Sequence, residues 1–236
     1  MRMTIGACFA GAMIGVAAYV LWLPDVAGLK RRNPAETSLM RLRELELKKL
    51  RRKPVRIQLW IPFERISPHL KNAVIVAEDG RFWEHQGIDW DEFEAAMRRN
   101  WEKRRLFYGA STITQQLAKN LYLSPSKNPV RKAKEFMIAR EMEERLGKRR
   151  ILELYLNVAE WGQGIYGAQA ASLHYFGKPA SDLSPQEAAT LAALLPSPAR
   201  YSKARNARYV ARMAQTILIR MRARGFLPPE ELPASV

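Results

Sequence analysis

An uninterrupted stretch of apolar and small residues near the amino terminus most constrains how this chain can fold. It runs from Met3 to Leu23 without a charged residue. A helix of roughly 20 such residues is long enough to cross the hydrocarbon core of a bilayer. Tyr19 and Trp22, near its end, favour the interface between lipid and water. The sequence therefore predicts a short amino-terminal tip and a transmembrane anchor over residues 1–24.

A cleaved signal peptide is the alternative interpretation of this stretch. Against it, Arg2 is the only basic residue before the apolar run, and no clear small-x-small cleavage site follows. Orientation is a separate matter. Lys30, Arg31 and Arg32 follow the run, and counted alone they would keep the rest of the chain in the cytoplasm. Large domains can be translocated despite flanking charge, so the local charges leave the orientation open.

The chain is strongly basic. Lys and Arg number 39 against 23 acidic residues, which gives a net charge of +16 over 236 residues. Such an excess indicates a polyanionic partner, which would be a nucleic acid, an anionic membrane surface or a phosphorylated substrate. The single cysteine excludes an intramolecular disulfide. The length suits one domain with a short appendage.

A basic linker over residues 25–54 is expected to connect the anchor to a single domain over 55–236. Within the linker, residues 37–53 place Leu39, Leu42 and Leu50 on one stripe of a helix whose other faces are basic. A helix of this kind either lies on anionic headgroups or forms a solvated stalk, and the sequence does not decide between them.

Helix signals predominate in the rest of the chain and predict a mainly α fold. Helix starts with capping residues are expected at Ser67-Pro68, at Asp89 with Glu92, and at Ser184-Pro185 with Glu187. Further helical runs cover 111–121, 131–157 with a break at Gly147, and 203–224, an arginine-rich run that ends at Gly225. Alternation over 55–60 predicts a strand.

The first candidate functional segment is residues 73–90, where an apolar run ends in Glu78-Asp79-Gly80 beside Phe82 and Trp83. A carboxylate at the end of a buried element has its pKa raised by desolvation, which suits proton transfer near neutral pH. The plainer interpretation is a helix that meets solvent there. His85 in this segment is more typical of a structural hydrogen bond than of catalysis.

The second segment is residues 109–121. Ser111 is a candidate helix cap, and the free N–H groups of a first helical turn bind anions. Gln115 and Lys119 are four residues apart and share a helix face. Polar groups of these types suit sugar hydroxyls and phosphate, although a polar helix start explains the pattern equally well.

The third segment, residues 131–145, places one carboxylate among cations. Arg131 and Glu135 are helix neighbours, and Lys132 and Lys134 flank them. The carboxylate is expected to stay ionised while the cations hold a pyrophosphate. Two carboxylates in contrasting environments are typical of an acid and base pair, although a charged helix face is the plain alternative. Nucleotide-binding loops, paired cysteines and a histidine metal triad are absent from the sequence.

In order and spacing these segments resemble the five motifs of the family 51 peptidoglycan glycosyltransferases. The matching residues are Glu78-Asp79-x-x-Phe82-x-x-His85-x-Gly87, Gly109-x-Ser111-Thr112-Ile113-Thr114-Gln115-Gln116-x-x-Lys119-Asn120, Arg131-Lys132-x-x-Glu135, Lys148-x-x-Ile151-Leu152-Glu153-x-Tyr155-Leu156-Asn157, and Gly164-x-x-Gly167-x-x-x-Ala170 with Tyr175-Phe176-Gly177. The resemblance covers about 37–220 and indicates the single-domain, monofunctional type. Ala110 departs from a frequent glycine of the family without touching a catalytic position.

The resemblance implies a lysozyme-like, two-lobed α fold over 55–236 that polymerises lipid II into β-1,4-linked glycan strands for the cell wall. Glu78 would deprotonate the acceptor's 4-hydroxyl, and that oxygen would displace polyprenyl diphosphate from the growing strand with inversion. Glu135 would organise the reacting groups. The implied substrate-binding residues are Asp79, Ser111, Thr112, Gln115, Gln116, Lys119, Lys127, Arg131 and Lys132. No cofactor is required, although a divalent metal (Mg or Mn) could assist.

The same resemblance places the catalytic domain on the outer, periplasmic side of a bacterial inner membrane, held by one anchor. The implied partners are lipid II, the growing glycan-polyprenyl diphosphate and the membrane. Cell-wall synthesis proteins are possible further partners, and nucleic acid is not expected. Two rival functions are a lysozyme-like lytic transglycosylase or hydrolase of peptidoglycan and a basic nucleic-acid or membrane-scaffolding protein. The cationic third segment argues against cleavage, because a mature glycan carries no pyrophosphate.

Overall fold

The computed structural model describes residues 2–104, 109–126 and 128–228, with the side chains of residues 2–10 and 12 outside that description. The described part is mainly helical, as the sequence predicts. Its α-helices are α1 (Arg2–Leu21), α2 (Ser38–Lys49), α3 (Pro68–Glu78), α4 (Trp90–Glu102), α5 (Ile113–Tyr122), α6 (Pro129–Leu146), α7 (Lys148–Val158), α8 (Ala168–Phe176), α9 (Pro185–Ala192), α10 (Pro198–Tyr201) and α11 (Ala207–Ala223). Its 3-10 helices are η1 (Ala27–Lys30), η2 (Phe63–Arg65), η3 (Ala180–Asp182) and η4 (Ala204–Asn206).

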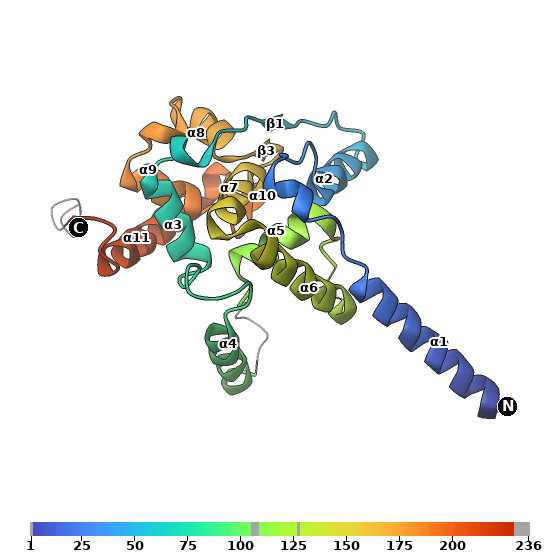
Figure 1. The fold of residues 1–236 in the computed structure, drawn as a ribbon. Coiled ribbons are helices and arrows are strands. Elements are labelled where there is room, and N and C mark those ends of the chain that lie inside the picture. The colour runs from blue at the N-terminus through green and yellow to red at the C-terminus, as the bar shows by residue number, and fades with distance from the viewer. Residues whose placement is uncertain (1, 105–108, 127, 229–236) are drawn as a thin grey trace.

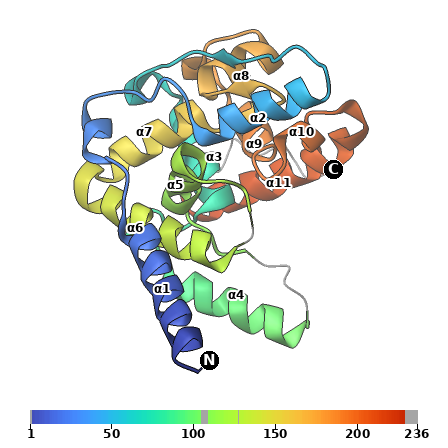
Figure 2. The same cartoon turned by 90° about the vertical axis from the view of Figure 1, so that its right-hand side faces the viewer.

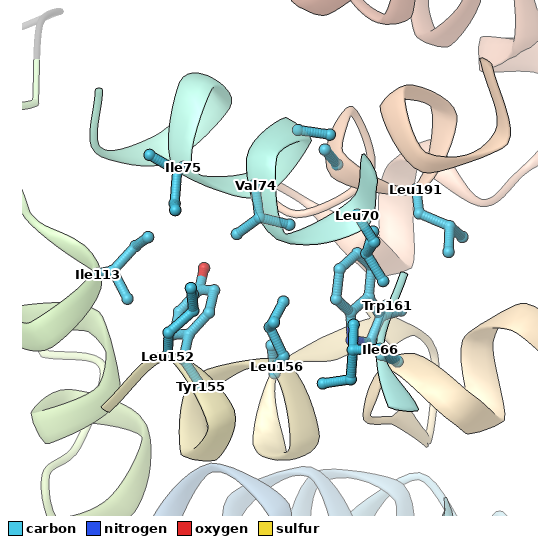
Figure 3. Packing of buried hydrophobic residues seen from close by; sticks show 14 of the residues in the cluster. Ile66, Leu70, Val74, Ile75, Ile113, Leu152, Tyr155, Leu156, Trp161 and Leu191 are labelled. Atoms are coloured by element: carbon cyan, nitrogen blue, oxygen red, sulfur yellow. The ribbon is translucent and has the colours of Figure 1, made fainter. Parts of the chain in front are cut away.

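Helix α3 lies in the middle of the body, packed against α9 and α11, while α5 packs against α6 and α7 (Figure 1). One core cluster joins these helices. In Figure 3, Leu70, Val74 and Ile75 of α3 lie above Leu156 of α7, with Leu191 of α9 beside them. Fully burying side chains of this size contributes about 1.5–3 kcal/mol each. The end of α3 is therefore held rigidly, which matters because Glu78 is its last residue.

A small three-stranded sheet closes one end of the body. β1 (Ile57–Gln58) pairs in parallel with β3 (Ile165–Tyr166), which pairs antiparallel with β2 (Glu160–Gly162). Only two residues of the strand predicted over 55–60 are therefore in a strand, and β2 and β3 carry no clear alternation in the sequence. The pairing of β1 with β3 joins residues about a hundred positions apart in the chain, a contact that local periodicity does not encode.

The capping signals in the sequence are confirmed at three helix starts. Ser67 accepts from the His69 N–H, Asp89 accepts from the Glu92 N–H, and Ser184 forms a capping box with Glu187. The predicted break at Gly147 is also confirmed, because this residue has φ +74° between α6 and α7.

The predicted cap at Ser111 is wrong by one residue. Thr112 caps α5 and forms the capping box with Gln115, so that the helix begins at Ile113. The hydroxyl of Ser111 instead accepts a hydrogen bond of 3.0 Å from Lys132. The Arg-rich helix also starts later than predicted, at Ala207, after the short helix η4.

The basic segment 25–54 packs on the body. Val26, Leu29, Thr37 and Met40 are buried, so Met40 makes the main contact of α2 in place of the predicted leucine stripe, of which Leu50 is exposed. Long-range polar contacts reinforce this packing. Arg43 bonds to Glu160 at 3.0 Å, and Arg150 donates to the Leu29 carbonyl at 2.8 Å. This docking differs from a free solvated stalk.

Helix α1 projects from the body and meets it at α6, where the Lys134 ammonium lies 3.9 Å from the centre of the Tyr19 ring (Figure 1). Within the described residues, no helix meets the length and hydropathy criteria for crossing a membrane.

Candidate active site

Glu78 is held by a chain of two hydrogen bonds. Gln116 of α5 donates to its carboxylate at 2.7 Å, and the Tyr155 hydroxyl of α7 donates to the Gln116 side-chain oxygen at 3.0 Å. Figure 3 shows Tyr155 rising from α7 with its hydroxyl toward α3. A tyrosine that donates to the amide oxygen leaves the amide N–H groups to face Glu78. The carboxylate is thus fixed from three helices.

Burial raises the pKa of Glu78 above its ordinary value, and the neighbouring Asp79 carboxylate adds to the rise. The Gln116 hydrogen bond and the Lys119 charge oppose this rise without cancelling it. Trp83, which the sequence suggested as a desolvating neighbour, is instead 52% exposed. A carboxylate with a raised pKa at the edge of a cleft is suited to accept a proton near neutral pH.

Asp79 joins the end of α3 to the start of α5. Its two oxygens lie 2.9 and 3.1 Å from His85 Nε2, and one of them accepts the Ile113 N–H at 2.9 Å. Thr112 acts similarly, since its hydroxyl donates to the Gly87 carbonyl at 2.6 Å. Both residues were predicted to bind substrate, and the structure places them near Glu78 with these polar atoms engaged inside the protein.

The third segment forms a compact cationic cluster around Glu135, which is only 2% exposed. Arg131 and Lys132 each form an ion pair with one of its oxygens. Lys132 also donates to Ser111 at 3.0 Å and to the Gln115 side-chain oxygen at 3.3 Å. As the sequence predicts, this carboxylate lies among cations, which is the opposite of the Glu78 environment.

Two further donors near this cluster have no acceptor among the described residues. Lys119 makes no hydrogen bond or ion pair with the described residues, and burial lowers the pKa of its ammonium group, an effect that Glu135 partly opposes. The side-chain nitrogen of Gln115 is buried without a hydrogen-bond partner among the same residues. Buried donors without acceptors are costly, so an anionic or hydroxyl-rich ligand would satisfy them.

A cleft of about 570 Å³ opens beside Glu78. It is lined by the end of α3, by residues 109–112, by Arg220 and Ala223 of α11, and by Arg224, which directly follows that helix. Arg224 donates to the Gly80 carbonyl, next to the catalytic candidate. The sequence predicts an Arg-rich helical run over 203–224 without assigning it to the site. Only the contact between Arg224 and Gly80 in the folded chain shows that this segment borders the cleft.

Two other residues that the sequence singled out do not contribute to the site in the described structure. Lys127 lies outside the described residues. Asn157 of the fourth motif exchanges hydrogen bonds of 2.9 Å with the Ile61 backbone, which supports the sheet. Across the described ranges, no group of three or more His, Cys, Asp or Glu residues is placed to hold a metal ion.

Comparison with known proteins gives concordant matches. The sequence profile described as "Transglycosylase" matches residues 45–222. A "Biosynthetic peptidoglycan transglycosylase" of Azoarcus sp. (strain BH72) is 46% identical over 209 residues, covering 88% of this chain and 90% of the relative. Proteins with the same description from Nitrosospira multiformis and Aromatoleum aromaticum are 48% and 50% identical over 189 residues, covering 80% and 78% of this chain and 82% and 81% of the relatives.

Proposed function

The chain belongs to the transglycosylase family of peptidoglycan glycosyltransferases of cell wall biosynthesis, and from this premise we propose how its own residues catalyse the polymerisation of lipid II. The contrast between Glu78 and Glu135 carries the proposal. Glu78 has a raised pKa and one amide donor, whereas Glu135 is ion-paired with two cations. A pair of carboxylates in such different environments divides into a base and a charge organiser.

In the proposed step, Glu78 removes the proton from the 4-hydroxyl of the acceptor sugar. That oxygen forms a bond to the anomeric carbon of the growing strand, and the bond from this carbon to polyprenyl diphosphate breaks with inversion. The proton remains on Glu78 and the electron pair leaves with the diphosphate. The Gln116–Tyr155 chain keeps the carboxylate pointed at the acceptor, since Tyr155 is buried in the core and holds Gln116 in place.

The leaving diphosphate is assigned to Lys119, Arg131 and Lys132. Lys119 has no protein counterion among the described residues, and the other two cations are already oriented by Glu135. Charges positioned before the reaction stabilise a developing anion without reorganising at the moment of bond cleavage. Ser111 and Gln115 complete the polar surface through their contacts with Lys132. We also propose a lysozyme-like, two-lobed fold, supported by the cleft between α11 and the start of α5.

We place the enzyme at the outer face of the bacterial inner membrane, with α1 as its single anchor. In Figures 1 and 2, α1 and α4 extend from the same side of the body. Large apolar side chains are exposed on both helices and directly after α1. Ile14 of α1 is 70% exposed, Trp22 just after α1 is 81% exposed, and Trp90 and Trp101 of α4 are 62% and 86% exposed. Aromatic residues of this kind suit the membrane interface. A reporter fused after Val236 that works only in the cytoplasm would contradict this orientation.

The test of the reaction is polymerisation of labelled lipid II by the full-length protein in detergent. Wild type should make long glycan, and Glu78→Gln should lose about 10²–10⁴-fold in rate, as expected for a general base. Gln116→Glu, which keeps the size of the partner but adds a charge beside Glu78, should also be impaired. Cleavage of purified sacculi without polymer formation would favour a lytic enzyme instead.

A further inference from the structure

A groove between α1 and α6 begins at the cationic cluster. It has a volume of about 530 Å³ and is lined by Gly15, Val16 and Tyr19 of α1 and by Ser124, Ser126, Asn128, Val130 and Arg131. Arg131 belongs both to this groove and to the cluster around Glu135. Arg131 therefore links the groove to the site assigned to the diphosphate.

The two sides of the groove differ in polarity, because its polar residues other than Tyr19 all come from residues 124–131. Near Arg131, its guanidinium donates to the Ser126 carbonyl at 2.6 Å, and Asn128 caps the start of α6 by accepting the Val130 N–H at 2.8 Å. On the α1 side the lining is aliphatic and aromatic, and a Cβ placed on Gly15 would meet nothing within 4 Å. A cationic residue on one side and an apolar helix on the other suit a ligand with a charged head and a hydrocarbon tail.

We propose that this groove binds the first isoprene units of the polyprenyl chain on the growing strand. The inference rests on the proposed function, because it needs the diphosphate to lie at Arg131. A chain attached to that diphosphate must leave the cluster along some path, and the groove supplies an apolar path toward α1. Lys134 beside Tyr19 holds α1 against α6, so the two walls of the groove stay together. Helix α1 then contributes to substrate binding as well as to anchoring.

The test uses a matched pair of substitutions on α1. Val16→Trp fills the groove, whereas Ile14→Trp makes the same kind of change about 200° away around the helix. Full-length variants are assayed with lipid II carrying its complete polyprenyl chain and with an analogue shortened to a few isoprene units. We expect Val16→Trp to lower the ratio of kcat/KM for the long over the short substrate by about tenfold, the effect of losing roughly two buried methylene groups. Ile14→Trp should keep the wild-type ratio.

Different results would contradict the groove proposal and the proposed function. An unchanged ratio in Val16→Trp, or an equal loss in both variants, would overturn the groove as the chain site. Failure of wild type to polymerise either substrate would instead overturn the proposed function. Should Val16→Trp not fold, Gly15→Leu with Ala17→Leu as its control replaces it, since Ala17 is exposed, lies about 200° around the helix from Gly15 and is not part of the groove lining.

Photocrosslinking provides a second measurement on the unmodified protein. A lipid II analogue with a photoreactive group on its first isoprene unit should label peptides containing residues 15–19 and 124–131. Labelling confined to other parts of the chain would contradict the proposal.

Discussion

The Tyr155 hydroxyl donates a hydrogen bond to the side-chain oxygen of Gln116 across 3.0 Å. This contact decides which end of the amide faces Glu78, because an amide turned the other way would direct its oxygen at a carboxylate. Tyr155 is itself fully buried in the core, so the orientation of the proposed base depends on a residue that has no need to touch substrate.

Replacing Tyr155 by Phe should therefore move the pH dependence of the enzyme. The Gln116 bond lowers the pKa of Glu78, so a freed amide lets that pKa rise. We expect the acidic limb of kcat/KM to move to higher pH and kcat to fall several-fold. The measurement is a pH–rate profile with lipid II. Tyr175→Phe is the matched control, since its hydroxyl donates to the Trp161 carbonyl at 3.0 Å, away from Glu78. An equal shift of the pH–rate profile in both variants would contradict a role for the Gln116–Tyr155 chain.

Glu78→Gln should stabilise the fold while abolishing activity. The folded-state pKa of Glu78 is raised, so the folded protein binds this proton more tightly than the unfolded chain. Stability is therefore lost as pH rises from the ordinary glutamate range through the folded pKa, by about 1.4 kcal/mol for every pH unit that separates the folded and unfolded pKa values. The variant should show a higher Tm than wild type at neutral pH and above, and no advantage below both pKa values. Thermal unfolding across pH checks this, and an equal difference at every pH would refute it.

Lys119→Met should separate substrate binding from folding. Burial lowers the pKa of this ammonium, so its charged form costs stability at every pH below the folded pKa. A methionine of similar length removes the cost, and the gain should be at most about 1 kcal/mol because the ammonium keeps some contact with solvent. The KM for lipid II should rise about tenfold or more, as expected when one diphosphate contact is lost. A fall in Tm with unchanged KM would make Lys119 a structural residue.

Arg224→Ala should lower kcat with little effect on stability. Its guanidinium contacts the Gly80 carbonyl but is otherwise exposed, so it positions the turn after Glu78 more than it supports the core. Gly80→Ala should act in the same direction, since a Cβ there would lie 2.7 Å from Arg224 Nη2. We expect a fall of a few-fold in kcat, partly restored in Arg224→Lys. Arg212→Ala, an exposed change on α11, which ends just before Arg224, is the control. Equal kcat in the Arg224 and Arg212 variants would remove Arg224 from the site.

Local signals in the sequence determined the helices and the two contrasting carboxylates. Helix caps and breaks depend on residues within about one turn, so a short window of sequence is enough to predict them. This holds for the caps at Ser67, Asp89 and Ser184 and for the break at Gly147. The pairing of Glu135 with Arg131 is likewise local, because residues four apart on a helix face each other. These features were accessible before any fold was known.

Only the tertiary structure decided what surrounds those residues. The donation of Gln116 to Glu78 joins positions 38 residues apart, and that of Arg224 to Gly80 joins positions 144 apart. The packing of Met40, the pairing of β1 with β3 and the groove between α1 and α6 also arise from partners remote in the chain. Such contacts form because many apolar side chains are buried together, and that collective gain has no counterpart in any short window of sequence.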